Sequence, residues 1–183
     1  MNDDLLFKTC YDIACESHAG QFREDGKPYI THIDAVIWNT REYFSSRAQG
    51  LDVFQYVYSV AALHDVLEDC PFWESNENKL GEEIFKRVGK GTKLNSMYFS
   101  TMLLAVKLLT KKPRGEEEYS DYLFNIKNHK WAQEVKIADL RHNLSDLKPC
   151  SRRDKYTISL AYLAGEERAK NILTSSQNRV TSL

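Results

Sequence analysis

Apolar residues recur at every third or fourth position along most of the chain, and strict alternation of apolar and polar residues is hard to find. A spacing of three and four is typical of an amphipathic α-helix, whereas strict alternation indicates a half-buried strand. The pattern therefore predicts an all-α domain of about seven or more helices. The predicted helices cover residues 5 to about 20, 32–44, 52 to about 68, 80–88, 102–109, 119–147 with a break near residue 128, and 153–173.

The segments between these helices contain residues that end helices. Residues 20–28 combine glycine, proline and charge, which predicts a loop. Pro71 ends the third helix or lies just beyond it. Residues 111–118 (KKPRGEEE) form a charged turn, and we expect a mobile loop there. The segment 102–109 is apolar nearly all round, so we expect it to be the most buried helix.

Composition limits the classes of protein that fit. The chain has 183 residues, of which 42% are hydrophobic and 11% aromatic, enough to bury the core of one domain. We assign this domain to residues 1–175 and expect a frayed tail over 176–183. The 25 basic and 26 acidic side chains argue against a nucleic-acid partner bound through many phosphate contacts. They leave room for a small cluster of cations that binds one phosphorylated ligand.

The sequence gives no sign of a membrane span or a secretion signal. No apolar run approaches the length of a span, and the first residues are acidic where a signal peptide would be positive. We therefore expect a cytoplasmic protein with no membrane partner. The cysteines form no C-x-x-C pair, so we expect thiols rather than a zinc site at Cys10, Cys15, Cys70 and Cys150.

Polar side chains suited to catalysis crowd into one otherwise apolar segment, Ala61–Asp69 (AALHDVLED). On a continuous helix His64 would lie over Glu68, and Asp65 over Asp69, because residues four apart are neighbours. A solvated face would explain the last two carboxylates, but it explains His64 and Asp65 less well, since both follow a buried-looking stretch. Adjacent imidazole and carboxylate groups can bind a divalent ion at about 2.0–2.2 Å.

Two further segments carry similar chemistry. In the segment 135–147, Asp139 and Asn143 are four residues apart and share a helix face, and Lys136 can reach the same edge. Taken alone, this segment would be an ordinary amphipathic helix. The loop over 20–28 brings Arg23 close in sequence to His32, at the start of the next predicted helix.

The order His…His-Asp…Asp resembles that of the HD-domain metal-dependent phosphohydrolases. More closely, the chain resembles the hydrolase domain of the RelA/SpoT alarmone enzymes and the stand-alone small alarmone hydrolases. The similarity extends from about residue 10 to residue 165. The matching segments are His18–Arg23 (HAGQFR), Gly26–His32 (GKPYITH), Ala61–Asp69 (AALHDVLED) and Lys136–Asn143 (KIADLRHN).

The resemblance implies a single HD-domain helical bundle and assigns roles to individual residues. One divalent metal ion, usually manganese in this family, would be bound by His32, His64, Asp65 and Asp139. Glu68 and Asp69 would form a catalytic pair that positions water and transfers protons. The implied substrate contacts are Arg23, Asn143, Lys111, Arg152 and Tyr156. The role of His142 is left open.

The activity that the resemblance implies is hydrolysis of the 3′-pyrophosphate of guanosine tetra- or pentaphosphate, which gives GDP or GTP and pyrophosphate. The sequence departs from the family pattern at Glu24, where a lysine is usual, at Ile33 and at Cys70. Because a carboxylate repels a polyphosphate, Glu24 keeps a second hypothesis open, a phosphohydrolase of another nucleotide or phosphate ester. A third is a nucleotide- or metal-binding module without turnover. The sequence leaves open whether the chain forms a homo-oligomer.

Overall fold

The computed structural model describes residues 5–44, 53–74, 77–89, 92–112 and 118–180. Within these ranges the chain is an all-α bundle of eleven helical segments, as the periodicity predicts, and its only β-type pairing is one isolated bridge between Phe22 and Pro28. The helices are α1 (Leu5–Ser17), α2 (Ile30–Phe44), α3 (Phe54–Leu63), α4 (Val66–Asp69), α5 (Pro71–Glu74), α6 (Glu77–Val88), α7 (Ser96–Leu109), α8 (Tyr119–Lys127), α9 (Lys130–Asp146), α10 (Ser151–Ala164) and α11 (Glu166–Val180).

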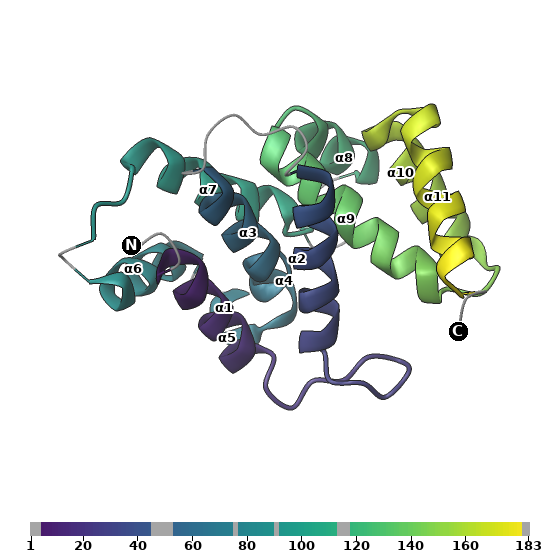
Figure 1. Ribbon diagram of the computed structural model, residues 1–183. Coiled ribbons are helices and arrows are strands. Elements are labelled where there is room, and N and C mark those ends of the chain that lie inside the picture. The colour runs from purple at the N-terminus through teal and green to yellow at the C-terminus, as the bar shows by residue number, and fades with distance from the viewer. Residues whose placement is uncertain (1–4, 45–52, 75–76, 90–91, 113–117, 181–183) are drawn as a thin grey trace.

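Helix α9 lies between the two halves of the bundle (Figure 1). It packs against α2, α3 and α7 on one side and against α8, α10 and α11 on the other. Ten of its residues are buried, three of them charged: Glu134, Asp139 and Arg141. The segment 102–109, predicted to be the most buried helix, has four buried residues and belongs to α7, whereas seven of the ten residues of α3 are buried, so that prediction is wrong.

The structure has more helices than the periodicity predicts, because some predicted helices are divided in two. Two of these divisions have local causes. The predicted helix over 153–173 is divided at Gly165, whose φ of +82° ends α10 because side-chain-bearing residues rarely adopt this conformation. The predicted helix over 52–68 is divided at His64 and Asp65 into α3 and α4. This second break lies in the candidate site and is explained below.

The loop between α1 and α2 is a short reversal that projects from one end of the bundle (Figure 1). Arg23 and Lys27 are joined by a backbone hydrogen bond of 2.9 Å, and Gly26 turns the chain with a φ of +80°. The loop therefore places Arg23 and Glu24 at the end of the bundle where α2 begins.

Several predictions concern the ends and the loops. The division into a domain over 1–175 and a tail over 176–183 stays a prediction; α11 extends to Val180, and 181–183 lie outside the described residues. Most of the predicted mobile loop, residues 113–117, also lies outside them. All four cysteines are free thiols, as expected. In the part of the chain that the structure describes, no helix is long and apolar enough to cross a membrane.

Candidate active site

Side chains from three separate parts of the fold converge at one buried point. His32 comes from the first turn of α2, His64 and Asp65 from the α3–α4 junction, and Asp139 from α9. The Nε2 atom of His32 lies 3.3 Å from Nε2 of His64, 3.4 Å from Oδ2 of Asp65 and 3.3 Å from Oδ1 of Asp139. The Nε2 atom of His64 lies 3.0 Å from Oδ2 of Asp65 and 3.9 Å from Oδ1 of Asp139.

This donor set fits a divalent metal ion. Neighbouring ligand atoms around an ion with bonds of about 2.0–2.2 Å are separated by about 3–3.5 Å, which is the spacing of most of these pairs. Within the described chain, His32, His64 and Asp65 form a group whose ligand atoms all lie within 4.8 Å of one another. Asp139 joins this group through the two imidazoles. Two imidazole nitrogens and two carboxylates could therefore hold one ion.

The break between α3 and α4 follows from the side chain of His64. Its Nδ1–H donates a 2.8 Å hydrogen bond to the carbonyl oxygen of Ala61, the group that a continuous helix offers to the amide of Asp65. Helix α3 accordingly ends at Leu63. Because a carbonyl only accepts, the hydrogen is on Nδ1, and Nε2 keeps its lone pair toward the other ligand atoms. The interruption thus aims Nε2 of His64 at the other candidate ligand atoms.

The charges around this centre favour a cation. Burial works to lower the pKa of His32, but the carboxylates of Asp139 and Asp65 outweigh it and raise that pKa to about 9. Burial also opposes the charge of Asp139, yet Lys136, whose Nζ lies 2.8 Å from Oδ2, and His32 hold the pKa of Asp139 below its ordinary value. A cluster that draws a proton onto an imidazole attracts a divalent cation for the same electrostatic reason.

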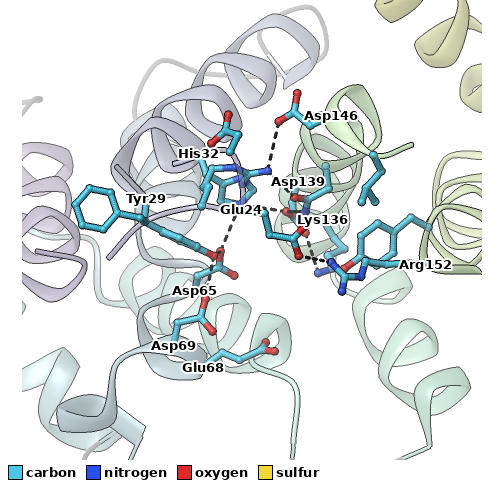
Figure 2. A pocket seen from close by; sticks show the side chains of 16 residues that line it. Glu24, Tyr29, His32, Asp65, Glu68, Asp69, Lys136, Asp139, Asp146 and Arg152 are labelled. Carbon is cyan, nitrogen blue, oxygen red and sulfur yellow. Dashed lines mark hydrogen bonds and ion pairs between the residues drawn. The ribbon is translucent and has the colours of Figure 1, made fainter. Parts of the chain in front are cut away.

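Glu68 and Asp69 lie on α4, next to these groups (Figure 2). Glu68 Oε2 accepts a 3.0 Å hydrogen bond from the backbone N–H of Lys111, and Asp69 Oδ2 accepts one of 2.9 Å from the hydroxyl of Tyr29. Burial raises the pKa of both carboxyls, and the charge of Asp65 adds to the rise. Two such carboxyls can exchange protons closer to neutral pH than exposed ones do.

Three of the four candidate ligands, His32, Asp65 and Asp139, line one cleft of about 410 Å³ together with Glu68 and Asp69. His64 is buried and does not line it. Four of the five predicted substrate-binding residues also line it: Arg23, Asn143, Arg152 and Tyr156. Lys111 is not among the lining residues; its backbone N–H contacts Glu68, and its Nζ lies over the ring of Tyr119, at 6.0 Å from the centroid. The substrate role of Lys111 stays a prediction.

The basic side chains of the cleft are paired with its acidic ones. Among the described lining residues seven are acidic and three basic, so the cleft is negative before any cation binds. Arg152 lies 2.8 Å from Glu24, the residue that departs from the family pattern (Figure 2). Arg23 lies 3.4 Å from Asp146, and Lys136 pairs with Asp139. An anionic ligand that enters the cleft therefore meets basic side chains that are already paired with carboxylates.

Comparison with known proteins shows which proteins this chain is similar to. No protein-family model matches the chain. It is 30% identical, over 171 residues, to a guanosine-3′,5′-bis(diphosphate) 3′-pyrophosphohydrolase of Haemophilus influenzae, covering 88% of this chain and 23% of that protein. It is 28% identical to the bifunctional (p)ppGpp synthase/hydrolase SpoT of Escherichia coli, covering 80% of this chain and 19% of that one. The chain is a homologue of these pyrophosphohydrolases.

The fold agrees with this relationship. A solved structure, described as a metazoan orthologue of SpoT that hydrolyses ppGpp, aligns over 97% of both chains with a TM-score of 0.63 and 20% identity. The sequence matches confirm the resemblance stated from the motifs, and the solved structure shows that the fold is shared. The chain spans about a fifth of the length of the curated pyrophosphohydrolases that it matches.

The structure adds three residues to the site of this pyrophosphohydrolase homologue that sequence reasoning did not assign. His142 Nδ1 lies 2.8 Å from His32 Nδ1, and burial together with His32 lowers the pKa of His142 to about 4. Asp146 pairs with Arg23, and Tyr29 contacts two carboxylates. The sequence holds a signal for two of these three residues. His142 and Asp146 follow Asp139 at three and seven residues, so they lie on the same helix face as that candidate ligand.

Proposed function

We propose that this chain is a metal-dependent phosphohydrolase that removes the 3′-pyrophosphate of guanosine tetra- and pentaphosphate, giving GDP or GTP and pyrophosphate. The observation that carries the proposal is the meeting of a buried His/Asp metal-binding group and an acidic pair in one cleft of a pyrophosphohydrolase homologue. The cytoplasmic location stays a prediction, and the oligomeric state stays open.

The proposed cofactor is one divalent ion, Mn²⁺, bound by His32, His64, Asp65 and Asp139. Mixed imidazole and carboxylate donors suit a metal of this kind. Such an ion, when bound, supplies Lewis-acid activation of water and polarises a phosphoryl oxygen. Lys136 and Asn143 keep Asp139 ionised and oriented, through contacts of 2.8 and 2.6 Å.

The remaining steps are assigned to side chains of the cleft. Glu68 and Asp69 position the attacking water, take up its proton and return a proton to the leaving group, for which buried carboxyls with raised pKa are suited. Arg23 and Arg152 bind phosphate oxygens, and their planar guanidinium groups can do so through two hydrogen bonds each. Asn143 and Tyr156 border the same space and contact the ribose or phosphate region.

A second candidate is hydrolysis of a less charged nucleotide or phosphate ester. The observation that favours it is the pairing of Arg152 with Glu24 and of Arg23 with Asp146. A polyphosphate has to displace these carboxylates before it reaches the guanidinium groups, and it is repelled by them until it does.

The test is product analysis by chromatography after incubation of the Mn²⁺-loaded protein with guanosine tetraphosphate, GTP, deoxynucleoside triphosphates, nucleoside monophosphates and cyclic nucleotides. Release of pyrophosphate from the first compound alone is the expected result. Turnover of another member of the panel instead would move the substrate to the second candidate.

Two classes of variant separate an enzyme from a binding module. His64→Ala should lose both metal and turnover. Glu68→Ala and Asp69→Ala should bind Mn²⁺ as the unmodified protein does and lose turnover. Normal hydrolysis by these last two variants would refute the role assigned to the acidic pair.

A further inference from the structure

Tyr29 is held in a fixed position between the loop and the first turn of α2. Its backbone N–H donates a 2.9 Å hydrogen bond to the carbonyl of Gln21. Its ring stacks on His18, with centroids 4.7 Å apart, and meets the ring of His32 edge-on at 5.5 Å. His18 is itself buried and lies 2.7 Å from Oε1 of Gln21. These contacts fix the ring without using its hydroxyl group.

The hydroxyl of Tyr29 touches two carboxylates with different proposed roles (Figure 2). It lies 2.7 Å from Oδ2 of Asp65 and 2.9 Å from Oδ2 of Asp69. The first oxygen is the one that approaches the imidazoles of the metal-binding group, and the second belongs to the acidic pair. One rigid side chain therefore contacts both functional parts of the cleft.

We propose that Tyr29 is a positioning residue that sets the distance between the metal ligand Asp65 and the proton-transferring carboxylate of Asp69. The part of this proposal that concerns Asp69 and turnover rests on the proposed function. Gln21 anchors the backbone carbonyl of Asp69 through a 3.1 Å hydrogen bond, but that contact leaves the carboxylate free to rotate. The hydroxyl of Tyr29 restrains that rotation, and it holds Asp65 in the rotamer that faces His32 and His64.

Partners that orient metal ligands typically change metal affinity or activity by about 10- to 100-fold when they are removed. Tyr29→Phe removes the hydroxyl and keeps the stacked ring. We expect the dissociation constant for Mn²⁺ to rise within this range. At saturating Mn²⁺ we expect kcat to fall while KM for the substrate stays unchanged, because the hydroxyl acts on the carboxylates.

The chain offers a matched control. Tyr11 on α1 donates a hydrogen bond of 2.7 Å to Oδ1 of Asp34, and neither residue lines the cleft. Tyr11→Phe removes a tyrosine–aspartate hydrogen bond of the same length as the one to Asp65. It should leave the Mn²⁺ dissociation constant and kcat unchanged. Thermal unfolding of both metal-free variants reports any general damage to the fold.

A double-mutant cycle distinguishes positioning from a general structural effect. If Tyr29 acts on turnover through Asp69, then adding Tyr29→Phe to Asp69→Asn should not lower the residual kcat of Asp69→Asn any further at saturating Mn²⁺. A full additional loss in that background would overturn the assignment to Asp69. An unchanged Mn²⁺ dissociation constant in Tyr29→Phe would overturn the assignment to Asp65.

The experiment is arranged so that a wrong substrate does not obscure the result. Metal affinity is measured by competition with a chromophoric chelator and needs no substrate. The kinetic comparison is run in parallel with guanosine tetraphosphate and with bis(p-nitrophenyl) phosphate, a chromogenic ester that needs no nucleotide recognition. Turnover of the ester alone by the unmodified protein would refute the proposed substrate, and the Tyr29 comparison would be decided on the ester.

Discussion

At the scale of single residues, the candidate metal ligands are held in place by side chains outside the proposed ligand set. Lys136 and Asn143 contact the two oxygens of Asp139, at 2.8 and 2.6 Å. His142 lies against the far nitrogen of His32. Each contact fixes the orientation of one ligand, and such neighbours contribute measurably to metal affinity.

The contact between His142 and His32 gives a first prediction. A neutral His142 accepts the hydrogen of His32 Nδ1 across 2.8 Å, which leaves Nε2 of His32 free as a ligand. His142→Phe should weaken Mn²⁺ binding by about 10- to 100-fold, measured by chelator competition. The control is His129→Asn, which changes a histidine at the other end of α9 to another residue that can cap that helix. Equal affinities of the two variants would contradict the role of His142.

The pair formed by Glu24 and Arg152 gives a second prediction. Both side chains are largely exposed, so their interaction is weak, but it competes directly with a phosphate. Glu24→Gln should lower KM for guanosine tetraphosphate by about two- to fivefold, with kcat unchanged and a steeper dependence on salt. Asp25→Asn, which removes a neighbouring carboxylate that pairs with Lys27, should have a smaller effect on KM. Steady-state kinetics at two ionic strengths checks both statements, and equal KM changes would argue against a competing ion pair.

At the scale of elements, helix boundaries decide where functional groups point. The end of α3 at Leu63 and the short helix α4 place the candidate ligands His64 and Asp65 next to the acidic pair, and Asp65, Glu68 and Asp69 line one cleft. Periodicity predicts one helix over 52–68, because it records which residues share a face. It does not record that the imidazole of His64 binds the carbonyl of Ala61 and interrupts the helix. A competition between side chain and backbone of this kind is decided by the packed structure.

The start of α7 provides a prediction about stability. The side chain of Asn95 accepts hydrogen bonds from the backbone N–H groups of Met97 and Tyr98, at 3.0 and 3.1 Å. Asn95→Ala should lower the free energy of unfolding by about 1 kcal/mol. For a chain of this length that corresponds to a fall in Tm of about 2–4 °C, measured by calorimetry. Asn95→Ser keeps a capping oxygen and should retain most of the stability; a loss as large as that of alanine would contradict the capping role.

At the scale of the whole molecule, the candidate ligands join parts of the chain that are far apart in sequence. His32 lies in the first turn of α2, His64 and Asp65 lie at the junction of α3 and α4, and Asp139 lies in the middle of α9, between the two halves of the bundle (Figure 1). Binding an ion at this point ties three packed elements together. Any ligand that binds only the folded state stabilises it in proportion to the logarithm of its concentration.

Metal binding should therefore raise the thermal stability of the protein. At a free Mn²⁺ concentration of about 100 times its dissociation constant, the expected gain is about 2.7 kcal/mol, or a rise in Tm of about 5–10 °C. A chelator should reverse the rise. Asp139→Asn should lose most of it, whereas His129→Asn should keep it. An equal rise in Tm for both variants in a thermal scan would place the ion elsewhere.

The amino-acid sequence by itself determined the helical class, most of the helices and the candidate ligand set. Helical periodicity is a local property, and the motif order His32, His64-Asp65, Asp139 can be read without coordinates. Only the tertiary structure decided which of these groups meet. The ion pair of Arg23 with Asp146 joins positions 123 residues apart, and the contact of Tyr29 with Asp69 joins positions 40 apart. The physical reason is that spacing along a helix fixes the face on which a side chain lies, whereas the packing of helices fixes what that face touches.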